Sequence, residues 1–233
     1  MPEQVTLITG ARKGLGRYLA EQRLARGERV YGCSREPSDL VSPRYEHFCL
    51  DVSDERAVRQ MFSRIRKEAG RLDHLVNNAG VASMNHAMLT PMSVVESILS
   101  TNVAGTFLMC REAARVMQTN GFGRIVNVTS VAAPLHLEGE SIYAASKSAV
   151  QTLTQILAHE LAPFGITVNA VGPTPVMTDL IRNVPADRIA SLLARQAIPR
   201  LGTPEDVHNV VDFFFRKESG FVTAQSVFLG GVC

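Results

Sequence analysis

Residues 5–16 read Val5-Thr6-Leu7-Ile8-Thr9-Gly10-Ala11-Arg12-Lys13-Gly14-Leu15-Gly16, and this stretch decides the fold. A short apolar run ends in a glycine-rich turn, and a helical pattern follows it. Gly10 permits a tight turn, while Gly14 and Gly16 let backbone amides approach a pyrophosphate at the positive end of the helix dipole. A strand, a glycine-rich turn and a helix in this order favour a dinucleotide site over a plain turn.

The next strand predicts which dinucleotide is bound. Residues 29–35 read as this second strand, and it ends in Ser34-Arg35. An acidic group at this position binds the ribose 2′-hydroxyl of NAD, whereas an arginine accommodates the 2′-phosphate of NADP. Lys13 in the glycine-rich turn adds a second cation, although Glu36 is an acidic neighbour that favours the opposite choice. The two cations favour NADP over NAD.

The rest of the chain repeats this alternation of strand and helix. We expect strands at residues 5–8, 29–35, 45–50, 72–76, 124–130, 166–171 and 226–229. Helices are expected between most of them, including long ones at 54–69, 91–117 and 143–164 and a last one capped by Thr203 with Pro204 at its first position. The pattern contains no linker, so it predicts one α/β domain, a doubly wound, seven-stranded parallel sheet of the Rossmann type spanning 1–233. Residues 177–199 are expected to form a two-helix excursion and a candidate substrate lid.

Polar residues follow the third and fourth strands, at the edge where cofactors bind in such sheets. Asp51-Val52 ends the third strand, where the Asp51 carboxylate suits the adenine amino group, or else starts a turn or caps the next helix. Asn77-Asn78-Ala79-Gly80 follows the fourth strand and suits close packing against a cofactor, or merely a turn.

The chemistry is predicted by Ser130, Tyr143 and Lys147. Tyr143 and Lys147 are four residues apart in a helical segment, so their side chains point the same way. An ammonium beside a phenol favours the phenolate, so Lys147 is expected to lower the pKa of Tyr143 from about 10. Ser130 ends an apolar strand, where its hydroxyl is suited to orient a carbonyl whose oxygen Tyr143 protonates.

Composition narrows the class of protein. A net charge of +2 with 20% charged residues gives no argument for nucleic acid. No apolar run approaches about 18 residues, so neither a signal peptide nor a membrane span is expected. Four scattered cysteines and six histidines without ligand spacing predict a reducing, cytoplasmic setting and no metal site.

Together these motifs resemble the short-chain dehydrogenase/reductase family across essentially the whole chain. The resemblance rests on Thr9-Gly-x-x-x-Gly14-x-Gly16, Asp51, Asn77-Asn78-Ala79-Gly80, Asn102, Ser130 and Tyr143-x-x-x-Lys147, in the family's order. It implies Tyr143 as general acid, Lys147 as the group that lowers its pKa and holds the nicotinamide ribose, and Ser130 as a hydrogen-bond partner of the substrate oxygen. Asn102 would hold a helix distortion and a water that relays protons to Lys147.

The resemblance also implies the cofactor contacts. Besides Tyr143 and Lys147, the expected positions are Gly10, Arg12, Lys13, Gly14, Leu15, Gly16, Ser34, Arg35, Asp51, Val52, Asn78, Ala79, Gly80, Thr129, Pro173, Val176 and Thr178. Lys13 with Arg35 looks like the NADPH-preferring carbonyl reductases of the family.

The general length and residues 201–206 look like the family's 3-oxoacyl-thioester reductases, so a 3-oxoacyl thioester is the leading substrate class. Two positions depart from the pattern of these reductases. Gly121 and Phe164 stand where arginines that dock an acyl carrier protein are expected, which weakens the case for such docking. Thr174 follows Pro173 where the family often has Gly. Small carbonyls, sugars and cyclic alcohols are the alternative substrates. A regulator that binds the cofactor without turnover is a remote alternative, because the Ser–Tyr–Lys set is intact.

Three further expectations concern surroundings and assembly. Glu138 and Glu140 precede Tyr143 and are read as a solvated loop rather than as contacts to a polar or cationic substrate. Met84 and Met88 are read as core residues rather than as the substrate mouth. The resemblance implies a homotetramer, or a homodimer.

Overall fold

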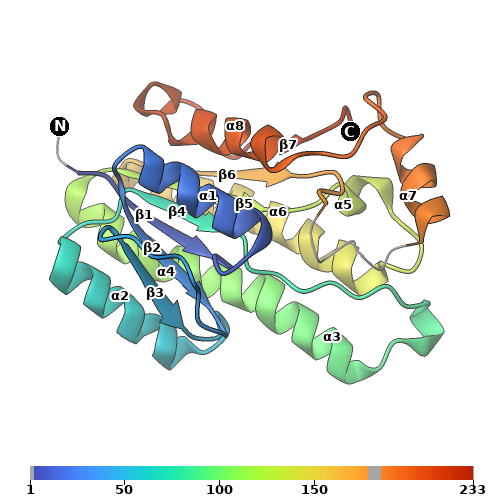
Figure 1. Ribbon diagram of the computed structural model, residues 1–233, viewed down its shortest axis with the longest axis horizontal. Helices are drawn as coiled ribbons and strands as arrows, with labels where there is room; N and C mark the ends of the chain where they lie inside the picture. Colours follow the sequence, from blue (N-terminus) through green and yellow to red (C-terminus); the bar gives the residue numbers. More distant parts are fainter. Residues whose placement is uncertain (1–2, 178–184, 233) are drawn as a thin grey trace.

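Seven parallel strands form one sheet in the computed structural model, which describes residues 3–177 and 185–232. The strands are β1 (Val5–Thr9), β2 (Arg29–Ser34), β3 (Tyr45–Cys49), β4 (His74–Asn77), β5 (Gly123–Val128), β6 (Ile166–Gly172) and β7 (Ser226–Phe228). Their order across the sheet is β3-β2-β1-β4-β5-β6-β7 (Figure 1). The chain leaves the centre in opposite directions on either side of β1 and β4, which confirms the doubly wound parallel sheet.

Helices cover both faces of the sheet (Figure 1). The longer ones are α1 (Gly14–Ala25), α2 (Glu55–Ala69), α3 (Met92–Leu99), α4 (Thr106–Met117), α6 (Ser141–Leu161), α7 (Ala186–Leu193) and α8 (Pro204–Phe215), with a short α5 (Ala132–Leu135). One apolar core lies between the sheet and α2, α4 and α6, and the other lies between the sheet and α1 and α8. Every residue of β1 and β6 is buried, as expected for strands covered on both faces.

The long helix expected at 91–117 is interrupted. A π-helical segment (Ser100–Gly105) lies between α3 and α4, and it contains the buried Asn102. The side chain of Asn102 bonds to the backbone of Val81 instead of to its own helix, while the Thr106 hydroxyl donates to the Asn102 carbonyl over 2.7 Å. The helix distortion implied by the family resemblance is therefore confirmed.

Capping residues were predicted for the N-termini of α8 and α2, and only the prediction for α8 is confirmed. Thr203 caps α8 in a reciprocal capping box with Asp206, and Pro204 is the first helical residue, as predicted. At α2 the cap is Asp54, whose carboxylate accepts from the Ala57 amide over 3.1 Å. The carboxylate of Asp51 instead accepts from the amide and hydroxyl of Ser53, so the capping role weighed for Asp51 is wrong.

Smaller corrections concern segment ends and exposed residues. β4 begins at His74 rather than at Leu72, and the described part of 177–199 contains a single helix, α7. Met84 is 40% and Met88 86% exposed, so their expected place in the core is wrong. Among the described residues no group of histidine, cysteine and acidic side chains has the geometry of a metal site.

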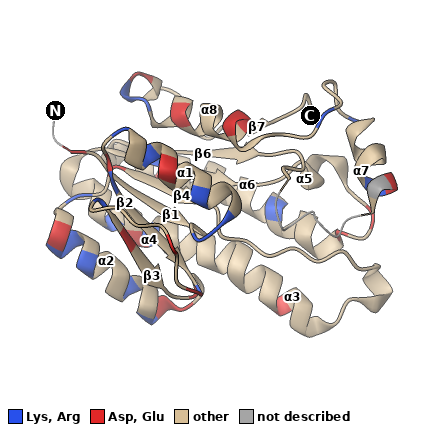
Figure 2. Ribbon diagram, viewed as in Figure 1, with Lys and Arg blue, Asp and Glu red and all other residues tan. Residues whose placement is uncertain are grey.

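Charge is distributed unevenly over the helices. Figure 2 shows acidic and basic residues along α1 and α2, where Arg17 pairs with Glu21 and Arg64 with Glu68, and few along α3 and α6. By length and composition alone the helical run Met92–Asn120 is apolar enough to cross a membrane. Its α4 part nevertheless contributes Met109, Cys110 and Met117 to the core beneath the sheet, which is the behaviour of a core helix.

Candidate active site

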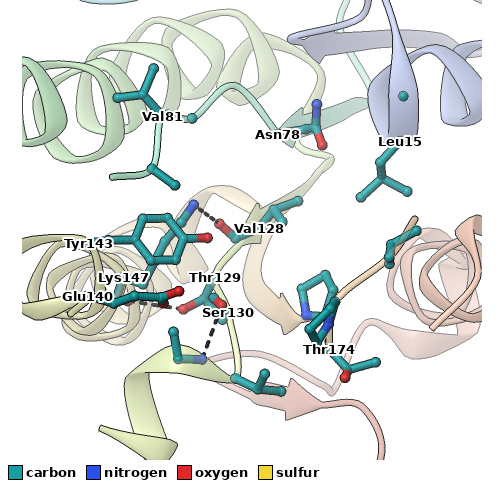
Figure 3. A pocket seen from close by; sticks show the side chains of 18 of the residues that line it. Leu15, Asn78, Val81, Val128, Thr129, Ser130, Glu140, Tyr143, Lys147 and Thr174 are labelled. Atoms are coloured by element: carbon teal, nitrogen blue, oxygen red, sulfur yellow. Dashed lines mark hydrogen bonds between the residues drawn. The ribbon is translucent and has the colours of Figure 1, made fainter. Parts of the chain in front are cut away.

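A cavity of about 530 Å³ opens at the carboxyl ends of the central strands. Figure 3 shows the side chains that line it: Tyr143 and Lys147 come from α6, and Ser130 follows β5. The residues predicted as site positions that line it are Lys13, Gly14, Leu15, Asn78, Gly80, Thr129, Ser130, Tyr143, Lys147, Pro173 and Val176. The fold therefore brings together glycine-rich turn, strand ends and helix, which lie far apart in the sequence.

Tyr143 and Lys147 are both nearly covered, with 9% and 5% of their surfaces exposed. Burial raises the pKa of the Tyr143 phenol to about 12, because a phenolate loses its hydration, and a hydrogen bond with Ser130 acts in the opposite direction. The Ser130 hydroxyl also accepts from the Ala132 amide over 3.1 Å, which orients it. Phenol and hydroxyl thus form a pair at one wall of the cavity.

Lys147 binds the backbone rather than the phenol. Its Nζ donates to the Val128 carbonyl over 2.8 Å and lies 5.8 Å from the centre of the Tyr143 ring. Burial lowers the pKa of this ammonium to about 8. The expected lowering of the Tyr143 pKa is therefore wrong in this structure, since burial of the phenol is the largest influence on its pKa and raises it.

Asn102 lies behind the cavity and does not line it. Its amide donates to the Val81 carbonyl (2.9 Å) and the Ser146 hydroxyl (3.0 Å), and its Oδ1 accepts from the Val81 amide (2.9 Å). Gly80 separates the Asn102 side chain from Lys147: a Cβ added there would lie 3.3 Å from Oδ1 and 3.4 Å from Nζ. Asn102 thus holds the 80–81 backbone against α6, and a proton relay through it stays a prediction.

A second cavity of about 300 Å³ adjoins the first and shares Lys13, Asn78 and Gly80 with it. The other predicted positions that line it are Gly10, Arg12, Ser34, Arg35, Asp51, Val52 and Ala79. Gly16 lines neither cavity; a Cβ there would lie 2.3 Å from the Gly10 carbonyl, so this glycine is needed for the close turn itself. Thr178 lies outside the described residues.

Two polar contacts shape this second cavity. Arg12 pairs with Glu36 over 2.8 Å, so the acidic neighbour of Arg35 is partly neutralised by the protein itself. The hydroxyl of Ser34 lies 2.8 Å from Nε2 of His47 on the neighbouring strand. Lys13 and Arg35 complete a wall rich in cations, which suits a phosphate group.

Three residues that matter to the site were not among the predicted positions. The Thr9 hydroxyl accepts from the amides of Asn78 (3.0 Å) and Ala79 (2.8 Å), which ties β1 to β4 at the cavity edge. The sequence alone does not show whether a threonine at the end of a strand bonds to a neighbouring strand or faces solvent. Glu140 lines the cavity, although it was read as part of a solvated loop, and so does Thr174, which replaces the more common glycine.

The arrangement fits a dinucleotide with the nicotinamide side in the larger cavity and the adenosine side in the smaller. A sequence model described as short chain dehydrogenase matches residues 4–189 of this chain. The chain belongs to the short-chain dehydrogenase family. It is an NAD(P)-dependent oxidoreductase with the Rossmann-type fold of that family.

Individual members of the family resemble this one over nearly the full length. The 3-oxoacyl-[acyl-carrier-protein] reductase FabG of Escherichia coli is 32% identical over 98% of this chain and 96% of its own. ElxO, solved with NADP bound, superposes with a TM-score of 0.89 at 29% identity, covering 97% of both chains. The ligand-free aldohexose dehydrogenase of Thermoplasma acidophilum superposes with a TM-score of 0.90 at 29% identity. The superposition covers 99% of this chain and 94% of the Thermoplasma chain.

Proposed function

We propose that this enzyme uses NADPH to reduce a ketone to a secondary alcohol, with Ser130, Tyr143 and Lys147 as its catalytic set and Asn102 behind them. The observation that carries the proposal is the gathering of a buried phenol, a strand-end hydroxyl and a buried ammonium in one cavity next to the glycine-rich turn. A phenol with a pKa of about 12 is protonated at neutral pH, which is the state that a general acid in reduction needs.

Each residue has a role in the proposed step. The bound dinucleotide supplies the hydride to the carbonyl carbon. Ser130 donates a hydrogen bond to the carbonyl oxygen, and Tyr143 gives its proton to that oxygen as charge develops on it. One N–H of the Lys147 ammonium donates to the Val128 carbonyl, and the other two N–H groups can donate to a ribose hydroxyl. Asn102 holds the backbone at Val81, so it keeps this wall in place.

The proposed cofactor is NADPH rather than NADH. Gly10, Gly14 and Gly16 form the turn for the pyrophosphate, and Lys13, Ser34 and Arg35 lie where a 2′-phosphate would be bound. Glu36 would repel that phosphate, but its carboxylate is paired with Arg12. ElxO, a structural relative with NADP bound, supports the same choice.

The leading substrate class is a 3-oxoacyl thioester, supported by the likeness to FabG. Docking of an acyl carrier protein is not part of the proposal, because Gly121 and Phe164 occupy the positions where docking cations are expected. A second candidate is a small hydroxylated carbonyl or sugar, which the carboxyl group of Glu140 in the cavity favours, as does the likeness to an aldohexose dehydrogenase.

We propose a homo-oligomer, a tetramer or dimer, in the cytoplasm. The helices α3 and α6 carry few charges (Figure 2), and large apolar side chains are exposed on α3, α4 and α6: 42% of Leu99, 41% of Phe107 and 51% of Ile156. Apolar side chains gathered on neighbouring helices are typical of a surface that a second copy covers.

The test is oxidation of NADPH and of NADH with acetoacetyl thioesters, diketones and sugars. Tyr143→Phe should lower turnover by about 10²–10⁴-fold, since it removes the proton donor, and should leave NADPH binding measurable by fluorescence. Turnover that survives in this variant contradicts the catalytic assignment. A preference for NADH contradicts the assignment of Lys13 and Arg35 to a phosphate.

A further inference from the structure

Glu140 stands immediately before α6 and three residues before Tyr143. Its backbone is held on both sides: its amide donates to the Leu137 carbonyl over 3.2 Å, and its carbonyl accepts from the Ala144 amide over 2.7 Å. The preceding Gly139 has φ of 81° and accepts from the Asn85 amide over 2.9 Å. The position of Glu140 is thus set by the fold and not by a free loop.

The carboxyl group of Glu140 lines the cavity that contains Tyr143 and Ser130, as Figure 3 shows. The same lining contains apolar side chains, among them Val131, Ala132 and Leu192, which offer no hydrogen-bond donor. Loss of hydration raises the pKa of this carboxyl group above its ordinary value. A polar group is therefore placed in a largely apolar part of the site.

No hydrogen bond or ion pair to this carboxyl group is formed by the residues that the structure describes. The buried Glu28 lies 3.3 Å from Arg23 and the buried Asp73 lies 2.5 Å from Arg71, so the other shielded acids do have partners. Glu140 is only partly buried, so water still reaches it, but its carboxyl group loses part of its hydration at the cavity wall and is available to accept a hydrogen bond from a ligand.

Two structural explanations do not account for Glu140. An acidic residue at a helix N-terminus is favoured by the helix dipole, but a capping carboxylate accepts from a backbone amide of the first turn, and this one accepts none. The ammonium of Lys147, which lines the same cavity, donates to Val128 and forms no hydrogen bond or ion pair with Glu140 among the described residues. Among the described residues nothing occupies this acceptor, so a substrate hydroxyl can bind to it.

We propose that Glu140 determines substrate class: it selects carbonyl compounds that carry a hydroxyl group near the carbonyl, and it rejects those with a negative charge there. This inference rests on the proposed ketone reduction at Tyr143, and of the two substrate classes proposed there it favours the small hydroxylated carbonyl over the 3-oxoacyl thioester. The carboxyl group accepts a hydrogen bond from the substrate hydroxyl while Ser130 and Tyr143 hold the carbonyl oxygen. A carboxylate on the substrate would face Glu140 at short range and be repelled.

The test compares three ketones of similar size with NADPH as reductant: butanone, its hydroxylated analogue acetoin, and the anionic analogue acetoacetate. The wild type should reduce acetoin with a kcat/KM about tenfold or more above that of butanone, the size expected when a site builds in an acceptor for a substrate hydroxyl. Glu140→Leu, which removes the acceptor, should lower this ratio severalfold, and Glu140→Gln, which keeps an acceptor but removes the charge, should raise the relative rate with acetoacetate. Glu138→Gln, a change at an exposed acid in the same loop, should alter neither.

The ratio uses butanone as an internal reference, so a general loss of folding or cofactor binding cancels. A ratio in Glu140→Leu within twofold of the wild-type ratio overturns the inference, as does a wild type without preference for acetoin. A second measurement is the rise in unfolding temperature of the NADPH complex when acetoin or butanone is added. Acetoin should raise this temperature more than butanone in the wild type, and the difference should shrink in the Glu140→Leu variant. If none of the three ketones is reduced, the proposed function is decided by the thioester, diketone and sugar assays above, and the temperature shifts decide the role of Glu140.

Discussion

The Thr9 hydroxyl connects the end of β1 to the residues after β4 by two hydrogen bonds, and these bonds can be removed with little change in the shape of the side chain. Thr9→Val replaces the hydroxyl by a methyl group and keeps the branched side chain that suits a strand. Thr9 is 1% exposed, and its Oγ1 accepts from the amides of Asn78 (3.0 Å) and Ala79 (2.8 Å). Both amides would lose their acceptor at the edge of the cofactor cavity.

The magnitude follows from the two lost bonds. Each unsatisfied amide costs about 1–3 kcal/mol, and the lower end applies because Asn78 and Ala79 are only half-buried and water can reach them. The free energy of unfolding should fall by about 2 kcal/mol. For a chain of this length the melting temperature should fall by about 4–8 °C. Affinity for NADPH should weaken as well, since Asn78 and Ala79 line the cavities.

Urea unfolding followed by far-UV circular dichroism measures the first effect, and fluorescence titration with NADPH measures the second. Thr152→Val is the matched control: Thr152 is exposed on α6, and its hydroxyl makes only a 3.4 Å contact with the Ser148 carbonyl. That control should stay within about 0.5 kcal/mol of the wild type. A Thr9→Val protein as stable as the control would refute the reasoning that the hydroxyl ties the two strands.

Two further predictions concern the glycine-rich turn and the buried ammonium. Gly16→Ala should abolish measurable NADPH binding and destabilise the fold, because its Cβ would lie 2.3 Å from the Gly10 carbonyl, whereas Gly70→Ala, with φ of 69° and open space around it, should cost only about 1 kcal/mol in urea unfolding. Equal losses for the two variants would contradict this. Lys147→Met should eliminate turnover yet raise stability at pH 7, because burial holds the pKa of Lys147 at about 8 against about 10.4 when unfolded. The penalty is complete below pH 8 and disappears as the pH rises toward 10.4, so the gain measured by urea unfolding should shrink over that range; a variant less stable than the wild type at pH 7 would contradict it.

Motifs with a local cause were predictable. The glycines of residues 10–16 need nothing beyond their own turn, and the Thr203 cap with Pro204 is a property of four consecutive residues. The alternation of strand and helix was sufficient for the seven-stranded parallel sheet, because each strand needs a crossover to return parallel. Asp51 shows the limit of such reasoning, since Asp54 was an equally good cap three residues later.

Properties that depend on burial were not predictable. The spacing of Tyr143 and Lys147 on one helix indicated that an ammonium would lower the phenol's pKa. Both groups are desolvated instead, and the ammonium donates to the Val128 carbonyl of β5. Glu140 looked like part of a solvated loop because nothing in its local sequence shows that it lines a cavity.

The sequence by itself determined the order of strands and helices, the glycine-rich turn and the set of Ser130, Tyr143 and Lys147, because these depend on residue type and spacing. Only the tertiary structure decided which groups lose water, which find partners, and that Glu140 lines the cavity. Desolvation depends on every segment packed around a side chain, and these segments come from distant parts of the chain.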